Sequence, residues 1–229
     1  MDAFRDAEQV VNNEQLTPSN YQLKKPLPTR EAAFFCYLCP PAHPRPNPKR
    51  MNPDHISLHN KQFEPYLSAA ELQAAIKQVA TQLNQEYTGQ PVIFVVVLNG
   101  SFMFAADLLK EVNLPCEVCF IRVASYQGTN STGEVKEVLG LTEDLRGRHV
   151  VIVEDIVDTG HTMRMLLDTL GSQQPASLEV ATLFLKPECL QQELSLRYVG
   201  LSIPNDFIVG YGLDFDGLGR NYPNVYKAV

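Results

Sequence analysis

The chain has 229 residues, of which 45% are hydrophobic, and a formal net charge of −7 at pH 7. This length suffices for one sizeable α/β domain with a small appendage, and the negative charge argues against a nucleic-acid partner because no basic face could dominate the surface. No apolar run is long enough to span a membrane, and the first residues lack the basic-then-apolar order of a signal peptide, so we expect a cytoplasmic protein with no membrane partner.

Residues 1–50 lack the pattern of a packed domain. Five prolines fall between Pro40 and Pro48, and the flanking residues show no sustained hydrophobic period. We expect a disordered extension, or a segment that is not translated if Met51 is the true start. A targeting peptide and a proline-rich docking arm are the functional alternatives.

The five cysteines, an odd number, suit reduced intracellular thiols better than a disulfide framework. Two Cys-x-x-Cys pairs, Cys36 with Cys39 and Cys116 with Cys119, could together supply four thiolates to zinc. However, Cys119 lies in an apolar strand pattern, in which alternation would send Cys116 and Cys119 to opposite faces. The first pair has no visible partner in its proline-rich segment, so we favour free thiols over a zinc site.

Regular elements are predicted from Met51 onward. Ser68 and Glu71 have the spacing of a capping box at the start of an amphipathic helix. Val92–Leu98 is an uninterrupted apolar run, which predicts a buried strand, and a helix over residues 102–112 follows it. Further strands of the same sheet are expected near residues 117–123, 149–153, 179–185 and 207–211. This alternation of strands and helices predicts a mostly parallel sheet with right-handed crossovers.

Residues 150–162 are the most informative stretch. Val150 to Val153 are apolar without alternation, as in a central parallel strand covered on both faces. Glu154 and Asp155 follow at its carboxyl end, where open α/β sheets bind ligands. The next residues offer small and hydroxyl side chains and a glycine, so that backbone N–H groups at a helix N-terminus can surround an anion. These residues are Asp158, Thr159, Gly160, His161 and Thr162.

Carboxylates beside a phosphate-binding turn suit a ligand with a phosphate and either a divalent cation or vicinal hydroxyls, as in a phosphorylated ribose. The following helix is indicated by apolar residues at i, i+3, i+4 and i+7, with Gly171 placed to end it. These residues are Met163, Leu166, Leu167 and Leu170.

This window resembles the phosphoribosyl-pyrophosphate motif of the type I phosphoribosyltransferases, and among them the hypoxanthine-guanine phosphoribosyltransferases. The shared pattern is an apolar strand, Glu-Asp, two aliphatic residues and Asp-Thr-Gly-x-Thr. Four motifs in the family's order extend the resemblance over residues 65–227. It implies an α/β fold in residues 51–229, with a central, mostly parallel sheet flanked by helices, a small hood and a mobile loop. A nucleotide hydrolase or a receiver domain is the alternative for the acid pair alone.

The resemblance also implies a second set of contacts to pyrophosphate. The loop Leu98-Asn99-Gly100 corresponds to one that binds pyrophosphate through backbone N–H groups and often contains a non-proline cis peptide. The family usually has Lys or Arg where this chain has Asn99, which places a side-chain charge contact in question. Arg220 matches a basic residue that contacts pyrophosphate. Residues 125–133 match the family's mobile loop. Its first two residues, Ser125 and Tyr126, would begin a lid that closes over the substrates. An ordinary connection between strands is the alternative.

Four residues match the family's purine-binding region. Lys186, at the end of an apolar run, would contact the exocyclic oxygen of a 6-oxopurine, although a surface lysine with an extended stem is the alternative. Phe207 would stack on the purine, whereas alone it would be interpreted as a core residue. The backbone of Ile208 would hydrogen-bond the edge of the base. Asp214 would face the 2-position of the base or a second magnesium ion.

The implied reaction transfers a phosphoribosyl group from phosphoribosyl pyrophosphate to hypoxanthine, and to guanine as well, with Mg²⁺ as the cofactor. By family analogy Asp158 is the general base for the N7 proton. Glu154 and Asp155 would hold the ribose hydroxyls directly, through water or through magnesium, so that Glu154, Asp155 and Asp214 are the candidate metal ligands. The alternatives are a regulator that senses phosphoribosyl pyrophosphate and an enzyme acting on xanthine or a pyrimidine. The family also implies a homodimer or homotetramer.

Overall fold

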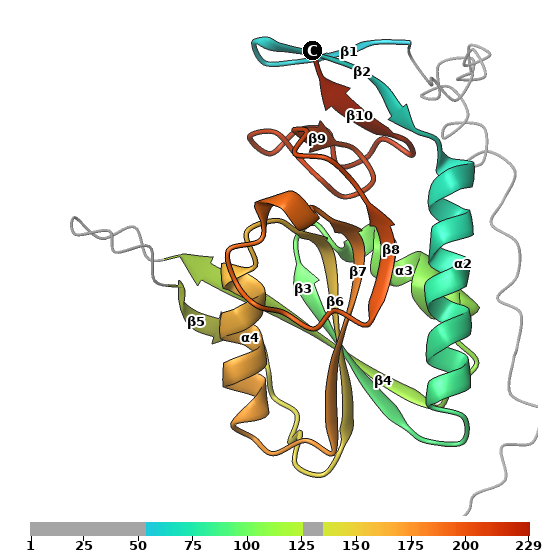
Figure 1. Ribbon diagram of the computed structural model, residues 1–229, viewed down its shortest axis with the longest axis vertical. Helices are drawn as coiled ribbons and strands as arrows, with labels where there is room; N and C mark the ends of the chain where they lie inside the picture. Colours follow the sequence, from blue (N-terminus) through green and yellow to red (C-terminus); the bar gives the residue numbers. More distant parts are fainter. Residues whose placement is uncertain (1–53, 126–134) are drawn as a thin grey trace, which may run out of the picture. The chain divides into compact units, whose positions relative to one another are not determined.

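The computed structural model describes residues 54–125 and 135–229, which form two β-sheets and the helices that cover the larger one (Figure 1). In chain order the elements are β1 (Ile56–Leu58), β2 (Lys61–Leu67), α2 (Ala69–Glu86), β3 (Val92–Leu98), α3 (Phe102–Glu111), β4 (Cys116–Ser125), β5 (Val135–Leu139), β6 (His149–Val157), α4 (His161–Gly171), β7 (Ser177–Leu185), the 3₁₀ turn η2 (Pro187–Cys189), β8 (Tyr198–Ser202), β9 (Ile208–Val209) and β10 (Val225–Ala228). Residues 1–53 and 126–134 lie outside this description, and with them the predictions for the N-terminal extension, Cys36, Cys39 and Tyr126.

The larger sheet has the order β5-β4-β3-β6-β7-β8, and all its pairs are parallel except that of β4 with the returning strand β5. The chain leaves β3 through α3 to reach β4 on one side, and leaves β6 through α4 to reach β7 on the other. The point at which the strand order reverses therefore lies between β3 and β6. In open α/β sheets, ligands bind beyond the carboxyl ends of the strands at such a point.

Both faces of the sheet are buried, as the unbroken apolar runs predict. Side chains alternate across it: Phe94 and Val96 pack with α2 and α3, whereas Ile93 and Val95 pack with α4. Helix α2 starts with the predicted capping box, in which Ser68 caps the backbone N–H of Glu71 and the Glu71 carboxylate accepts from the Ser68 N–H. The predicted helices over 102–112 and over the apolar residues 163–170 are also confirmed, as α3 and α4, although α4 includes Gly171, which was expected to end it.

A second, four-stranded antiparallel sheet of order β1-β2-β10-β9, together with the segment 203–224, forms what we call the hood. Its small core consists of Ile56, Leu58, Phe63, Val209 and Tyr226. The prediction that residues 207–211 complete the larger sheet is wrong, because β9 pairs with β10 in the hood. The edge strand of the larger sheet next to β7 is instead β8. Its sequence Tyr-Val-Gly-Leu-Ser has too weak an apolar pattern to predict a strand.

The acid pair lies within a strand rather than after it, so its expected position is also wrong by a few residues. β6 continues through Glu154 and Asp155 to Val157, still paired with β7 on one side. Its pairing with β3 ends at Val153. β6 thus extends beyond its β3 pairing by four residues, and the two carboxylates occupy the edge that β3 leaves free.

Two further observations bear on the predictions from composition. Cys116 is exposed and Cys119 is buried, so the expected placement on opposite faces is confirmed. In the part of the chain that the structure describes, none of the helices has the length and apolar character needed to cross a membrane.

Candidate active site

The predicted acid pair lies near the carboxyl ends of β3 and β6 and is largely shielded from solvent. Glu154 is 9% exposed and Asp155 is half-buried. Burial raises the pKa of Glu154 well above its usual value, and the negative charge of Asp155 raises it further. Burial also raises the pKa of Asp155, against hydrogen bonds from its surroundings and the positive charge of Arg220, which lower it. Two adjacent carboxyls that resist ionisation form a site that a cation or a hydroxyl-rich ligand can stabilise.

Asp155 is packed against the predicted pyrophosphate loop. A Cβ atom on Gly100 would lie 1.5 Å from Asp155 Oδ2, so a larger residue there would displace this carboxylate. On the other side, a Cβ on Gly212 of the hood would lie 2.0 Å from the carbonyl oxygen of Gly100, and Gly212 has a φ of +99°. The peptide bond between Leu98 and Asn99 is cis, as the resemblance implied. The loop is therefore held between β6 and the hood, with no room for a side chain at either glycine.

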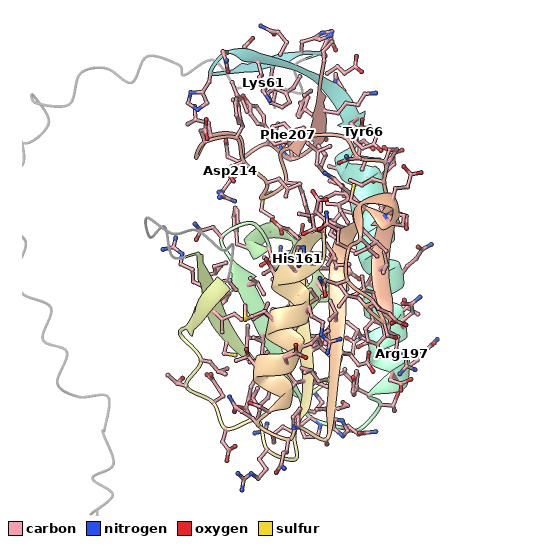
Figure 2. All side chains as sticks on the ribbon, turned by 60° about the vertical axis from the view of Figure 1, so that its left-hand side comes forward. Lys61, Tyr66, His161, Arg197, Phe207 and Asp214 are labelled. Atoms are coloured by element: carbon pink, nitrogen blue, oxygen red, sulfur yellow. The ribbon has the colours of Figure 1, made fainter. Side chains whose placement is uncertain are left out.

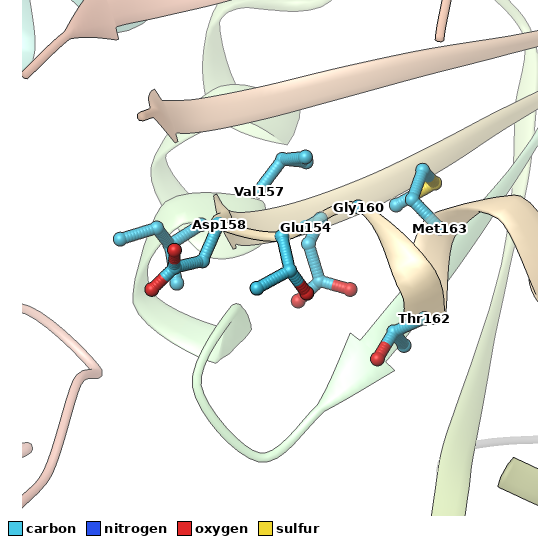
Figure 3. Close-up of a pocket in the computed structure, with 8 residues that line it drawn as sticks. Glu154, Val157, Asp158, Gly160, Thr162 and Met163 are labelled. Carbon is cyan, nitrogen blue, oxygen red and sulfur yellow. The ribbon is translucent and has the colours of Figure 1, made fainter. Parts of the chain in front are cut away.

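The turn after β6 has the geometry of an anion site. Gly160 adopts a left-handed conformation at the N-cap of α4, and no side chain caps that terminus. The first N–H groups of α4 are thus available to a phosphate. The adjoining cavity has a volume of about 100 Å³. Glu154, Asp158, Gly160 and Thr162 are among the residues that line it (Figure 3). The sequence-predicted cradle is therefore brought together with the acid pair.

The segment after η2 closes one side of this turn. The backbone N–H of Gln191 donates to the Thr159 carbonyl at 3.0 Å. His161 Nε2 lies 3.0 Å from Gln191 Oε1, and Gln192 Nε2 lies 3.0 Å from His161 Nδ1. Both ring nitrogens of His161 thus lie within hydrogen-bond distance of a glutamine side chain. The two glutamines hold His161 beside the phosphate-binding turn.

Lys186 follows the carboxyl end of β7 and is buried, with 6% of its surface exposed, so the surface-lysine alternative is wrong. Its Nζ lies 3.0 Å from Asp158 Oδ2 and 3.5 Å from Asn205 Oδ1. The sequence placed the two residues in separate roles, and the structure joins them in one ion pair. A buried ammonium next to a half-exposed carboxylate can present a donor and an acceptor side by side.

The hood supplies an aromatic surface. Phe207 is 43% exposed, unlike a core residue, and its ring centroid lies 5.6 Å from that of Phe215. Lys61 Nζ lies 4.7 Å from the centroid of Phe207. Figure 2 shows Lys61 and Phe207 in the hood and His161 at the start of α4. Ile208 is buried in β9 opposite Lys227, and the contact of its backbone with a base stays a prediction.

Asp214 and Arg220, predicted to contact different parts of the ligand, contact one another. Arg220 Nη2 lies 2.7 Å from Asp214 Oδ1, and its Nη1 donates to the Gly212 carbonyl at 2.7 Å. Asp214 Oδ2 accepts from the Gly217 N–H at 2.7 Å. The pair thus joins parts of the hood segment to one another, including Gly212. Of the predicted lid, the structure describes only the backbone of Ser125, the last residue of β4.

Sequence reasoning missed two contacts to the site. Arg122 of β4 donates to Asn99 Oδ1 at 3.1 Å. The Tyr211 hydroxyl donates to Asp107 Oδ2, which also accepts from Gln73, and this network joins the hood to α3 and α2. Arg122 could have been found, because a charged residue near the carboxyl end of a parallel strand points to a site by the same rule that identified Glu154. The Tyr211 network has no local signal.

The donor set fits a magnesium ion. Glu154 and Asp155 offer carboxylate oxygens, the ligands that Mg²⁺ prefers, and the buried pair would gain from a cation that offsets its charge. Residues 54–125 and 135–229 contain no group of three or more His, Cys, Asp or Glu side chains that could hold a metal by itself. Mg²⁺ usually combines one or two carboxylates with substrate oxygens and water. Asp214 is held by Arg220 and is a weaker candidate ligand.

Comparisons with known proteins agree with this geometry. The family model described as phosphoribosyl transferase domain matches residues 64–216. Among curated proteins, hypoxanthine phosphoribosyltransferase of Salmonella typhimurium is 41% identical over 169 residues, covering 72% of this chain and 95% of that protein. Hypoxanthine-guanine phosphoribosyltransferase of Staphylococcus aureus is 38% identical over 169 residues, covering 73% and 94%.

Solved structures show the same likeness. The crystal structure of a hypoxanthine-guanine phosphoribosyltransferase from Bacillus anthracis has a TM-score of 0.68 and 37% identity, and the match covers 72% of this chain and 98% of that one. The hypoxanthine phosphoribosyltransferase of Trypanosoma cruzi has a TM-score of 0.69 and 34% identity, with coverage of 76% and 95%. The chain therefore belongs to the phosphoribosyltransferase family and, within it, to the hypoxanthine-guanine phosphoribosyltransferases.

Proposed function

We propose that the protein transfers the phosphoribosyl group of 5-phosphoribosyl 1-pyrophosphate to hypoxanthine and guanine, giving the nucleoside monophosphates and pyrophosphate in purine salvage. The observation that carries this proposal is the Lys186–Asp158 ion pair, which lies beside an uncapped helix N-terminus and a buried acid pair. The helix end suits the 5-phosphate, the acid pair suits the ribose hydroxyls, and the ion pair suits one edge of a 6-oxopurine.

At that edge, the Lys186 ammonium donates to the 6-oxo group, and Asp158 accepts the proton from N7 of the purine. During transfer the bond between ribose C1 and the pyrophosphate oxygen breaks and a bond from the purine N9 to C1 forms. The proton leaves N7 for Asp158, so the product base is neutral. The Lys186 ammonium, 3.0 Å from Asp158, holds this carboxylate at the edge of the base where the N7 proton leaves.

The remaining residues bind and orient. Glu154 and Asp155 hold the ribose hydroxyls and would, with substrate oxygens, hold a magnesium ion, while residues 158–162 surround the 5-phosphate. When bound, Mg²⁺ would offset the negative charge that develops on the departing pyrophosphate. Phe207 stacks on the purine, with Ile208 at the edge of the base and Asp214 near its 2-position. The backbone of residues 98–100 and the guanidinium of Arg220 contact pyrophosphate, and Ser125 and Tyr126 belong to a lid that excludes water.

A panel of free bases tests this proposal. The protein is incubated with phosphoribosyl pyrophosphate, Mg²⁺ and one of hypoxanthine, guanine, xanthine, adenine or a pyrimidine, and the nucleotides are identified. We expect hypoxanthine to exceed adenine by about 10⁴-fold in kcat/KM, because adenine cannot accept the Lys186 hydrogen bond. Equal use of adenine would contradict the assignment of Lys186. Binding of phosphoribosyl pyrophosphate without turnover of any base would favour the sensing regulator.

We further propose that residues 51–229 form the phosphoribosyltransferase domain, that residues 1–50 are an extension outside it, and that the protein acts in the cytoplasm. We also propose a homodimer or homotetramer. Its support is three exposed hydrophobic residues, Phe102 at the start of α3 and Val118 and Phe120 of β4, which are 43%, 37% and 52% exposed. Light scattering after gel filtration tests this: a Phe120→Glu substitution should reduce the mass of the assembly, and an unchanged mass would place the interface elsewhere.

A further inference from the structure

Asn99 lies in the loop that the family resemblance assigns to pyrophosphate, and the structure shows a basic side chain reaching it from another strand. Arg122 lies directly opposite Leu98 in the parallel register of β3 and β4. Its Nη2 donates to Asn99 Oδ1 at 3.1 Å. Both side chains are exposed. A guanidinium is therefore present at the loop although the loop's own residue is neutral.

This hydrogen bond also determines the direction of the Asn99 amide. A guanidinium has only donors, so the atom of Asn99 that faces Arg122 must be the carbonyl oxygen. The two N–H groups of the amide consequently point away from Arg122. Arg122 uses one of five N–H donors in this contact and keeps the others. Asn99 and Arg122 together thus present amide and guanidinium donors around one loop, all suited to anionic oxygens.

Arg122 differs from Lys186 and Arg220, the basic residues of the site that already form ion pairs with carboxylates. Lys186 is paired with Asp158, and Arg220 with Asp214. Among residues 54–123 and 140–229, no ion pair involves Arg122. The loop that it contacts is packed against Asp155, one of the two buried carboxylates. A pyrophosphate bound there needs a nearby cation, and Arg122 is placed to supply it.

We propose that Arg122 is a pyrophosphate-binding residue of this enzyme, which acts together with Asn99 in place of the basic side chain that the loop lacks. This inference rests on the proposed function, because it concerns the pyrophosphate end of the same site. Arg122 orients the Asn99 amide through one N–H group and offers its positive charge and remaining donors to the anion. It acts on binding of pyrophosphate and of phosphoribosyl pyrophosphate rather than on the base.

The first test is calorimetric titration with magnesium pyrophosphate. Arg122→Gln retains an amide donor for Asn99 but removes the charge, and we expect the Kd to rise about tenfold, as for loss of one charge-assisted contact. Arg122→Lys keeps the charge and should lose much less. The matched control is Arg146→Gln, which removes an exposed arginine before the amino end of β6 and should leave Kd unchanged.

The second test restores the charge from the loop itself. Asn99→Lys combined with Arg122→Gln should recover most of the lost affinity for magnesium pyrophosphate, since one cation again lies at the loop. In steady state, Arg122→Gln should raise the KM for phosphoribosyl pyrophosphate about tenfold and change kcat and the KM for hypoxanthine much less.

The outcomes separate the two proposals. If the wild type binds magnesium pyrophosphate and forms nucleotide, and Arg122→Gln binds equally well, the role of Arg122 is wrong and the proposed function stands. Equal losses in Arg122→Gln and Arg122→Lys would also overturn the charge argument. If the wild type neither binds magnesium pyrophosphate nor forms nucleotide, the proposed function fails and the inference fails with it.

Discussion

The core sheet and the hood contribute to one site in contrasting ways. In the core, Glu154 to Thr162 are contiguous in sequence, and one strand, one turn and one helix N-terminus position them. In the hood, Phe207, Asp214 and Arg220 depend on a sheet whose strands come from both ends of the described chain, with β1 and β2 before α2 and β9 and β10 at the C-terminus.

The two regions also handle charge differently. The core places two carboxyls side by side, and burial raises the pKa of both. The hood pairs opposite charges at 2.7 Å and exposes an aromatic ring. The core is therefore incomplete without a ligand that offsets its carboxylates, whereas the hood is electrostatically satisfied and offers a surface for stacking. The Gly100 loop, held between Asp155 and Gly212, joins the two.

The largest expected effect concerns the chemistry that we assign to the core. Asp158→Asn keeps the shape of the side chain and an acceptor for Lys186 but cannot take up a proton, so kcat should fall by about 10²-fold. Binding of phosphoribosyl pyrophosphate should change little. Asp168→Asn is the control, because Asp168 is an exposed carboxylate on α4 paired with Arg164. An unchanged rate of the chemical step in single-turnover kinetics would refute the assignment.

The next prediction tests whether the hood must rest on the core loop. Gly212→Ala combines an unfavourable φ of +99° with a Cβ atom 2.0 Å from the Gly100 carbonyl. Gly217→Ala, at a φ of +84° with nothing within 4 Å, has the backbone strain alone. We expect thermal unfolding to show a loss of about 1–3 kcal/mol for Gly217→Ala and a larger loss for Gly212→Ala. Equal losses would mean that the close approach to Gly100 is unimportant for stability.

A smaller effect is expected in the pH dependence of stability, because Glu154 is buried in the core. The pKa of Glu154 is raised above its usual 4.5 in the folded protein. The folded state then holds this proton more tightly than the unfolded chain, so the free energy of unfolding declines as the pH rises from about 4.5 to the folded pKa, by at most ~1.4 kcal/mol for each pH unit. Glu154→Gln should remove the contribution of Glu154 and so make this decline smaller in the ligand-free protein. Exposed Glu193→Gln should not, and identical pH profiles of Tm for wild type and Glu154→Gln would contradict the prediction.

The smallest expected effect lies outside both regions. Every assigned site residue follows residue 65, so a protein that starts at Met51 should retain full turnover and the same assembly. Limited proteolysis of the whole chain, followed by kinetics on the trimmed product, provides the measurement. Resistance of residues 1–50 to protease, or a change in turnover or mass after their removal, would show that they belong to the working protein.

Much of the core could be predicted because its signals are local. The capping box at Ser68 depends on residues three positions apart, and the unbroken apolar runs of β3 and β6 depend only on both faces being covered. The hood was harder because its strands are short and two of them, β1 and β9, have only three and two residues. For the same reason residues 207–211 were assigned to the wrong sheet.

The sequence by itself determined the strand, acid pair, phosphate-binding turn and helix of residues 150–171, since neighbours along the chain are also neighbours in space there. Only the tertiary structure decided which charged groups meet. Lys186 and Asp158 are separated by 28 residues, and Arg122 and Asn99 by 23. Their contacts follow from the order and register of parallel strands, which long-range packing sets and no local pattern records.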